Sequence, residues 1–451
     1  MAKKSYEIDM CNGPILKKIL LFAIPLACAN ILQLLFNAVD IIVVGRYVGD
    51  EALAAVGSTT HIINLFISVF MGLSVGVNVL VARKYGAKDQ EGISRAVRTS
   101  VAISLMCGLV LACLGIVFAT PILRLVNAPE DILPLAKIYL QFYFAGMPVI
   151  MFYNFGAAVL RAVGDTRRPL FYLTIAGVIN VLLNLFFVLV LDMSVVGVAL
   201  ATTLSQVVSA VFVFRAIMTS GFGFPLKEIR IYKRELKEIV RVGLPAGIQS
   251  SFFSISNVIV QSAVNGFGSV VVAGGAAASN IGGFIQKALD SFTQATVSFT
   301  SQNVGAKKTE RINRVLFTSL GCVVAIGTTT AMMCYFGGEM LLKLYTDNPA
   351  AIANGMVRLR YIGCFYVFLG IMSVFANTIR GMGYSLLPMI STLLGTAIFR
   401  IAWIQTVIRV ERFRRVELVY VVYPISWVLT AIALAIAFVI LKKKLIRKFR
   451  G

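Results

Sequence analysis

The chain has 451 residues, of which 58% are hydrophobic and only 14% charged, whereas soluble domains are roughly 45–50% apolar and about 25% charged. This composition excludes an ordinary soluble globule. The net charge of +22 would favour nucleic acid as a partner in a soluble protein, but the apolar content indicates membrane lipid instead. Seven scattered cysteines without a C-x-x-C pair, and a single histidine, argue against a disulfide framework and a metal centre.

Twelve apolar stretches have about the 20 residues that a helix needs to cross a bilayer core of about 30 Å. The first is too long for a removable signal peptide. The sequence therefore predicts an all-α polytopic membrane protein with twelve transmembrane helices. The predicted spans are residues 15–44, 58–82, 101–119, 133–160, 170–191, 195–218, 239–267, 276–299, 315–336, 355–379, 386–408 and 418–441.

The basic residues sort by side of the membrane. With a cytoplasmic N-terminus, 30 Lys and Arg flank the inner ends of the spans and ten flank the outer ends. The positive-inside rule then predicts a plasma (inner) membrane protein with both termini in the cytoplasm, and it accounts for the net charge without nucleic acid. The loop 409–415 does not follow this pattern, because four arginines lie there on the predicted outer side.

The chain repeats itself at an offset of 219 or 220 residues. The matches are Pro25 with Pro245, Gly86-Ala87-Lys88 with Gly305-Ala306-Lys307, Arg161 with Arg380, Gly164 with Gly383, and Pro169 with Pro388. Six spans per half make this a parallel repeat, an arrangement in which two lobes commonly enclose a central cavity. We expect an N-lobe at residues 1–220, a cytoplasmic linker at 221–235 and a C-lobe at 236–451.

The sequence has no P-loop and no soluble segment long enough for an enzymatic domain. We therefore expect a protein that is not an enzyme and has no cofactor. The energy for any transport must come through the membrane or from a partner.

A polar stripe follows the first span. Asn30, Gln33, Asn37 and Asp40 are spaced 3, 4 and 3 residues apart, so they share one helix face. An acid inside the membrane is costly and marks a functional site by default. Desolvation allows Asp40 to take up a proton, and surrounding oxygens would allow it to hold a sodium ion. A helix-packing seam is the alternative interpretation of the stripe.

The fifth and sixth spans add amide and hydroxyl oxygens. Asn180 and Asn184 are four residues apart and share a face, and Thr202 and Thr203 lie on the next span. The asparagine pair alone fits interhelical hydrogen bonding as well as a cation site.

The second half differs from the first. Asn257 aligns with Asn37, but Val260 takes the place of Asp40. Lys287 and Asp290 lie one turn apart on the eighth span, where each could neutralise the other. Arg400 lies deep in the eleventh span, and snorkelling toward the outer interface is one interpretation.

These motifs resemble the multidrug and toxic compound extrusion (MATE) family. The resemblance runs from about Pro14 to the last span. It is carried by Pro25, Val39-Asp40-Ile41-Ile42-Val43-Val44-Gly45-Arg46, Ala52-Leu53-Ala54-Ala55-Val56-Gly57, Gly86-Ala87-Lys88-Asp89, Leu160-Arg161-Ala162-Val163-Gly164-Asp165-Thr166, Arg380-Gly381-Met382-Gly383 and Tyr423-Pro424-Ile425-Ser426-Trp427.

The resemblance implies two six-helix lobes in a V shape around a central cavity, and export by alternating access driven by proton or sodium antiport. It also implies small amphipathic substrates, usually organic cations, and we expect a monomer. The coupling residues it indicates are Asp40, Asn180, Asn184 and Thr202. The candidate cavity residues are Gln33, Asn37, Asn154, Asn257 and Gln261, and the candidate hinge is Pro25.

Two alternatives belong to other functional classes. A lipid-linked saccharide flippase would have a cationic cavity, which Lys287 and Arg400 favour, whereas twelve spans and the motif at Asp40 argue against it. A membrane receptor or scaffold would transport nothing.

Overall fold

A computed structural model describes residues 6–125, 129–220 and 229–450, and within them the chain is helical without strands. The α-helices are α1 (Ile15–Tyr47), α2 (Asp50–Gly86), α3 (Gln90–Val117), α4 (Ala119–Leu125), α5 (Leu133–Ala145), α6 (Met147–Ala162), α7 (Arg167–Leu185), α8 (Ser194–Thr219), α9 (Lys233–Asn265), α10 (Ser269–Gly305), α11 (Thr309–Lys343), α12 (Pro349–Tyr361), α13 (Tyr366–Gly381), α14 (Leu386–Thr392), α15 (Phe399–Thr406) and α16 (Val416–Arg450). Shorter π and 3₁₀ segments are η1 (Phe186–Val190), η3 (Gly363–Phe365), η4 (Leu393–Ile398) and η5 (Glu411–Phe413).

The membrane-spanning character of these helices follows from their length and composition. Nine helices in the described parts of the chain are long and apolar enough to cross a membrane, and counting α5 and α6, bent by 46°, as one span gives ten. These ten coincide with ten of the twelve predicted spans. The other two predictions fall on α9 and α10, which have 33 and 37 residues but more polar stretches.

The internal repeat extends to the backbone conformation. Positive φ angles occur at Gly49 and Gly268, at Lys88 and Lys307, and at Gly164 and Gly383, and the members of each pair are 219 residues apart. Residues other than glycine rarely adopt this left-handed conformation, so the two lysines at φ 58° and 57° are a specific match. Both halves of the chain therefore turn in the same way at corresponding points.

The chain divides into two compact units: Met1–Asp9 with Cys28–Gly247, and Met10–Ala27 with Ile248–Gly451. The boundaries fall inside α1 and α9, two residues after Pro25 and Pro245 respectively. Proline cannot donate the helical hydrogen bond and weakens the helix at that point. The units therefore differ from the predicted lobes. The first half of α1 belongs to the unit that holds the second repeat, and the first half of α9 belongs to the unit that holds the first repeat. Much of the predicted linker, residues 221–228, lies outside the described residues.

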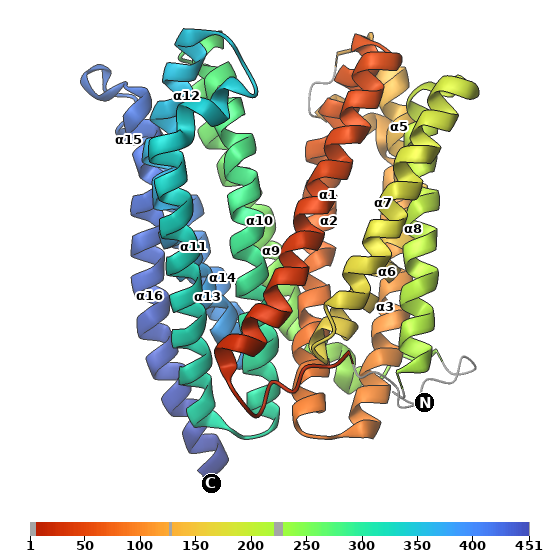
Figure 1. The fold of residues 1–451 in the computed structure, drawn as a ribbon, viewed down its shortest axis with the longest axis vertical. Helices are drawn as coiled ribbons and strands as arrows, with labels where there is room; N and C mark the ends of the chain where they lie inside the picture. The colour runs from red at the N-terminus through yellow and green to blue at the C-terminus, as the bar shows by residue number, and fades with distance from the viewer. Residues whose placement is uncertain (1–5, 126–128, 221–228, 451) are drawn as a thin grey trace. The chain divides into compact units, whose positions relative to one another are not determined.

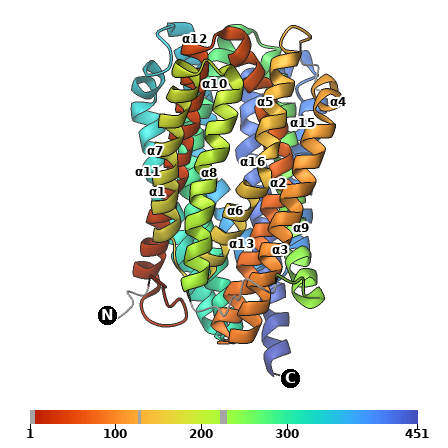
Figure 2. The same cartoon turned by 90° about the vertical axis from the view of Figure 1, so that its right-hand side faces the viewer.

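In the first unit, α3 packs against α6 and α7 against α8 (Figure 2). Glycines bring α2 against the first half of α9. A Cβ atom on Gly72 would lie 2.1 Å from the backbone nitrogen of Gly247, and one on Gly76 would lie 2.3 Å from the carbonyl oxygen of Ile239. Small residues allow this backbone approach, which favours helix association in lipid.

In the second unit, α11, α13 and α16 lie side by side, with α10 packed against α11 and α13 (Figure 1). The first half of α1 joins this unit through Phe22, whose ring meets that of Phe299 edge-on at 6.0 Å. The segment before α1 is held by polar contacts: Asn303 Nδ2 donates to the Met10 carbonyl at 3.1 Å, and Arg311 Nη2 to the Gly13 carbonyl at 2.7 Å.

Candidate functional site

The predicted coupling residues of the first unit form one hydrogen-bonded chain. Asn184 on α7 donates its amide to the Asp40 carboxylate on α1 and lies 3.4 Å from Asn180 Oδ1, one turn earlier. Asn180 in turn donates to the Thr202 hydroxyl on α8 at 3.4 Å, and Thr202 bonds the Val198 carbonyl at 3.0 Å. Three helices thus bring together the four residues that the sequence indicated.

This network lies inside the packed unit. Asn184 is fully buried and Asn180 is 5% exposed. The Oδ1 atom of Asn184 has no hydrogen-bond partner among the described residues. Buried polar atoms are nearly always satisfied, so an acceptor left open beside a carboxylate is notable. One residue later α7 gives way to the π-helical η1, a deviation that is frequent at functional sites.

The chemistry of these groups suits a small hard cation. Carboxylate, amide and hydroxyl oxygens are ligands for such ions, and a buried carboxylate can alternatively carry a proton. Tyr139 and Tyr143 on α5 are close enough to interact electrostatically with Asp40. No cluster of three His, Cys, Asp or Glu suited to a transition metal occurs in the described part of the chain.

Other predicted cavity residues lie outside this network. Gln33 and Asn37 are exposed on α1. The Asn154 amide is used within its own helix, donating to the Ile150 carbonyl at 2.8 Å. Gln261 contacts Asn265, at 3.1 Å. Their role in lining a substrate cavity stays a prediction.

Arg400 is the other prominent buried charge. It is 0% exposed, and its guanidinium lies over the ring of Tyr423 at 4.2 Å from the centroid. Its Nε donates to Ser426 Oγ and its Nη1 to Asn257 Oδ1, both at 3.0 Å. This is not the snorkelling geometry considered from the sequence, because the head group is enclosed by α9 and α16.

Sequence reasoning did not find the surroundings of Arg400. Tyr423, Ser426 and Trp427 were identified only as part of a family motif. Their spacing of three and then one residue places them on one face of α16, which was the available signal.

Lys287 and Asp290 do not form an ion pair in the described structure: Lys287 is exposed and Asp290 is half-buried on α10. Their mutual neutralisation stays a prediction.

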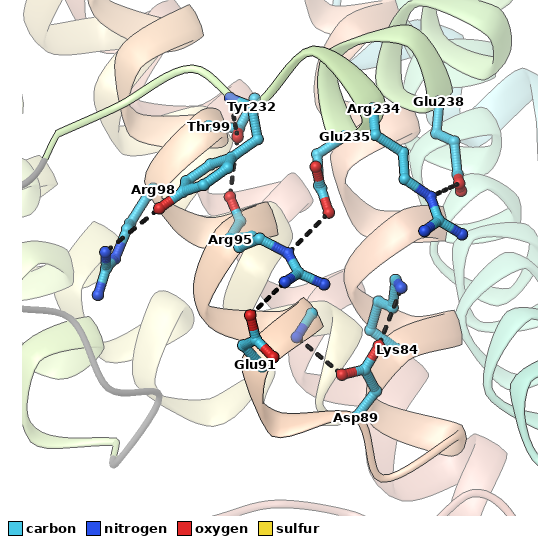
Figure 3. Close-up of polar contacts among 11 residues, drawn as sticks. Lys84, Asp89, Glu91, Arg95, Arg98, Thr99, Tyr232, Arg234, Glu235 and Glu238 are labelled. Carbon is cyan, nitrogen blue, oxygen red and sulfur yellow. Dashed lines mark hydrogen bonds and ion pairs between the residues drawn. The ribbon is translucent and has the colours of Figure 1, made fainter.

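A second polar group, shown in Figure 3, fastens the start of α9 to α3 within the first unit. Glu235 is 3% exposed and accepts a hydrogen bond from Arg95 Nε at 3.1 Å. The backbone amide of Tyr232 donates to the Thr99 hydroxyl at 3.2 Å. On α2, outside the group drawn in Figure 3, Arg83 pairs with Glu238 at 3.7 Å. These contacts were not predicted from the sequence.

Comparison with known proteins gives matches over nearly the whole chain. The MatE family model matches residues 25–186 and 245–404. "Probable multidrug resistance protein YpnP" of Bacillus subtilis (strain 168) is 28% identical over 393 residues, covering 87% of this chain and 88% of the relative. YoeA of the same organism, described in the same way, is 29% identical over 381 residues, covering 82% and 81%.

A solved structure described as the outward-facing conformation of a multidrug resistance MATE family transporter has the same fold. Its TM-score is 0.90, with 24% identity, and the match covers 98% of this chain and 99% of that one.

Fold and matches define the class as a multi-pass, all-helical membrane transporter rather than an enzyme. The chain belongs to the MatE family of multidrug efflux transporters. The family resemblance and the polytopic helical fold predicted from the sequence are thereby confirmed.

Proposed function

We propose that this protein is a secondary active exporter that exchanges a proton or a sodium ion for a small amphipathic molecule by alternating access. The observation that carries the proposal is the hydrogen-bonded chain from Asp40 through Asn184 and Asn180 to Thr202. It joins an acid inside the membrane to neutral side chains on two other helices, whose oxygen atoms can act as cation ligands. Such a set can bind and release a cation.

The energetics suit this role. One elementary charge moving across about 100 mV releases about 2.3 kcal/mol, which sustains roughly a 50-fold gradient of a neutral substrate. The unit boundaries just after Pro25 and Pro245 support a hinge role for Pro25, since a proline-weakened helix bends at low cost.

The family match in both halves favours an exporter over a lipid-linked saccharide flippase or a non-transporting scaffold. The charge count supports a plasma-membrane location with both termini in the cytoplasm. Relatives are described as multidrug resistance proteins, which supports small amphipathic substrates. Organic cations are the family-based expectation.

The test is transport by purified protein in proteoliposomes under an imposed pH gradient, an imposed sodium gradient, or neither. Rhodamine 123 and carboxyfluorescein provide a cationic and an anionic amphipathic dye. We expect one of the two gradients to drive dye against its concentration gradient. Dye movement that only equilibrates, or that ignores both gradients, contradicts antiport.

A further inference from the structure

Two arginines of the second unit contact neighbouring amides on α9. Arg400 donates to Asn257 Oδ1 at 3.0 Å, and Arg358, on α12, donates to Gln261 Oε1 at 3.4 Å. Asn257 and Gln261 are four residues apart and therefore lie on the same face of α9. The two cationic groups are thus presented along one polar stripe of the helix.

The same two arginines also contact neighbouring aromatic rings on the last helix, α16. The Arg400 guanidinium lies 4.2 Å from the ring centroid of Tyr423, and the Arg358 guanidinium lies 5.6 Å from that of Tyr420. These tyrosines are three residues apart on α16. Each guanidinium therefore contacts an amide of α9 and an aromatic ring of α16.

No acid balances these cations. Neither arginine takes part in an ion pair within the described residues, and α9 from Ile248 onward, together with α12 to α15, contains no Asp or Glu. The neighbouring helices carry Asp290 on α10 and Glu417 on α16, and neither forms an ion pair with these arginines in the described structure. A buried charge without a counter-ion is strongly unfavourable, more so in a membrane. Cation–π contacts offset part of that cost, but they do not neutralise the charge.

Around Arg400, two buried hydrogen-bond donors lack an acceptor. Its Nη2 and the Nε1 of Trp427 are buried and have no partner among the described residues. The Ser426 hydroxyl donates to the Tyr423 carbonyl at 2.7 Å, so it serves Arg400 as an acceptor. The surroundings of Arg400 therefore lack an acceptor oxygen and a negative charge. A carboxylate or a phosphate supplies both, and its oxygens match the planar geometry of a guanidinium.

We propose that Arg400, with Arg358 beside it, binds the anionic oxygen group of the exported molecule, a carboxylate or a phosphate. The rings of Phe253, Tyr423 and Trp427, which lie 5.3, 4.2 and 5.9 Å from the Arg400 guanidinium, accommodate its apolar part. This inference rests on the proposed export function and gives the substrate a charge opposite to the family-based expectation.

Asn257 gives the site its entrance. It is half-buried whereas Arg400 is fully buried, and its amide oxygen occupies the position of an anionic acceptor. An incoming carboxylate replaces this neutral acceptor with a charged one, a stronger hydrogen bond.

The experiment measures equilibrium binding of carboxyfluorescein and of rhodamine 123, a cation on a similar ring system, to the purified full-length protein in phosphatidylcholine nanodiscs. We expect carboxyfluorescein to bind, and Arg400→Gln to weaken that binding at least about ten-fold while changing rhodamine 123 binding little. Arg360→Gln is the matched control, because Arg360 is exposed on the same helix as Arg358 and contacts Tyr335.

Asn257→Asp keeps the test valid if Arg400→Gln fails to fold. The new carboxylate would pair with Arg400 and fill the anion position from within. We expect this variant to melt at a higher temperature than wild type and to lose carboxyfluorescein binding. Competition by benzoate and by phenyl phosphate distinguishes a carboxylate site from a phosphate site.

Two results would overturn the proposal: wild-type protein that binds rhodamine 123 but no carboxyfluorescein, or unchanged carboxyfluorescein affinity in Arg400→Gln and Asn257→Asp. The result is separable from ion coupling. Asp40→Asn should bind carboxyfluorescein normally even when it no longer transports, so failure of antiport and failure of anion binding give different patterns.

Discussion

Asn184 on α7 donates a hydrogen bond from its side-chain amide to the carboxylate of Asp40 on α1, although 144 residues separate them. The same amide lies 3.4 Å from Asn180 Oδ1, so Asn184 is the junction between the acid and the neutral part of the network. The position of the acid is thus coupled to the α7–α8 contact.

Removing that junction tests the network. Asn184→Ala deletes the contact to Asp40 while removing little apolar surface, so we expect the protein to fold and its ion dependence to weaken. The apparent affinity for the coupling ion should fall about ten-fold, the value of one charge-assisted hydrogen bond. The measurement is initial transport rate against ion concentration in proteoliposomes.

Asn354→Ala is the matched control, because the Asn354 amide bonds the Ala350 carbonyl of its own helix at 2.9 Å. An unchanged ion dependence in Asn184→Ala would remove this residue from the coupling site.

The glycine contact between α2 and α9 predicts a stability effect. Gly72→Ala places a Cβ atom where Gly247 has its backbone, and such overpacking costs about 1–3 kcal/mol. A Cβ atom on Gly321, in α11, meets nothing within 4 Å, so Gly321→Ala should leave stability equal or raise it by up to about 1 kcal/mol. Thermal unfolding in detergent compares the two variants. Equal melting temperatures would contradict the packing assigned to Gly72.

The attachment of α9 to α3 should depend on Glu235. Glu235→Ala leaves Arg95 with its exposed partner Glu91 alone and should lower the unfolding free energy by about 1–3 kcal/mol. Lys343→Ala, which breaks the exposed pair with Glu339, should change it little. If the two variants have the same melting temperature, Glu235 contributes no more to stability than a surface charge does.

The surroundings of Asp89, in the turn before α3, should make the stability of the protein depend on pH in the acid range. The Lys84 ammonium, followed by the Gly92 backbone amide, lowers the pKa of the Asp89 carboxyl below its ordinary value of 3.8. The folded state therefore favours the ionised form. Its contribution to stability is fully present above the ordinary pKa and is lost as the pH falls through the lowered value.

Asp89→Asn keeps the oxygen that accepts from Gly92, at 2.8 Å in wild type, but loses the charge that faces Lys84. The variant should be less stable than wild type near neutral pH, and the difference should shrink toward about pH 3. A difference in melting temperature that is the same at both pH values would contradict this origin.

Some features of the fold were accessible from sequence because they depend on local patterns. Apolar length predicted the helices. The internal repeat was visible in the sequence, and the structure adds matching left-handed turns at Lys88 and Lys307. The four coupling candidates could be found because an acid and amides spaced along helix faces stand out in an apolar chain.

Other features depend on which helix faces meet, and a single sequence does not specify that. Arg400 on α15 is enclosed by Asn257 and Tyr423. This requires both α9, which is distant in the sequence, and α16, the next α-helix, to pack against α15. The crossing of α1 and α9 between units was missed for the same reason, since hydropathy treats each helix as one element.

The measurement that tests the account most directly is ion-driven transport by Asp40→Asn in proteoliposomes, alongside wild type at equal protein content. The swap keeps the size and hydrogen bonding of the side chain but removes its charge and its titration. We expect the variant to insert, to bind dye, and to lose accumulation driven by a pH or sodium gradient. Accumulation at the wild-type rate would show that the coupling ion does not use Asp40.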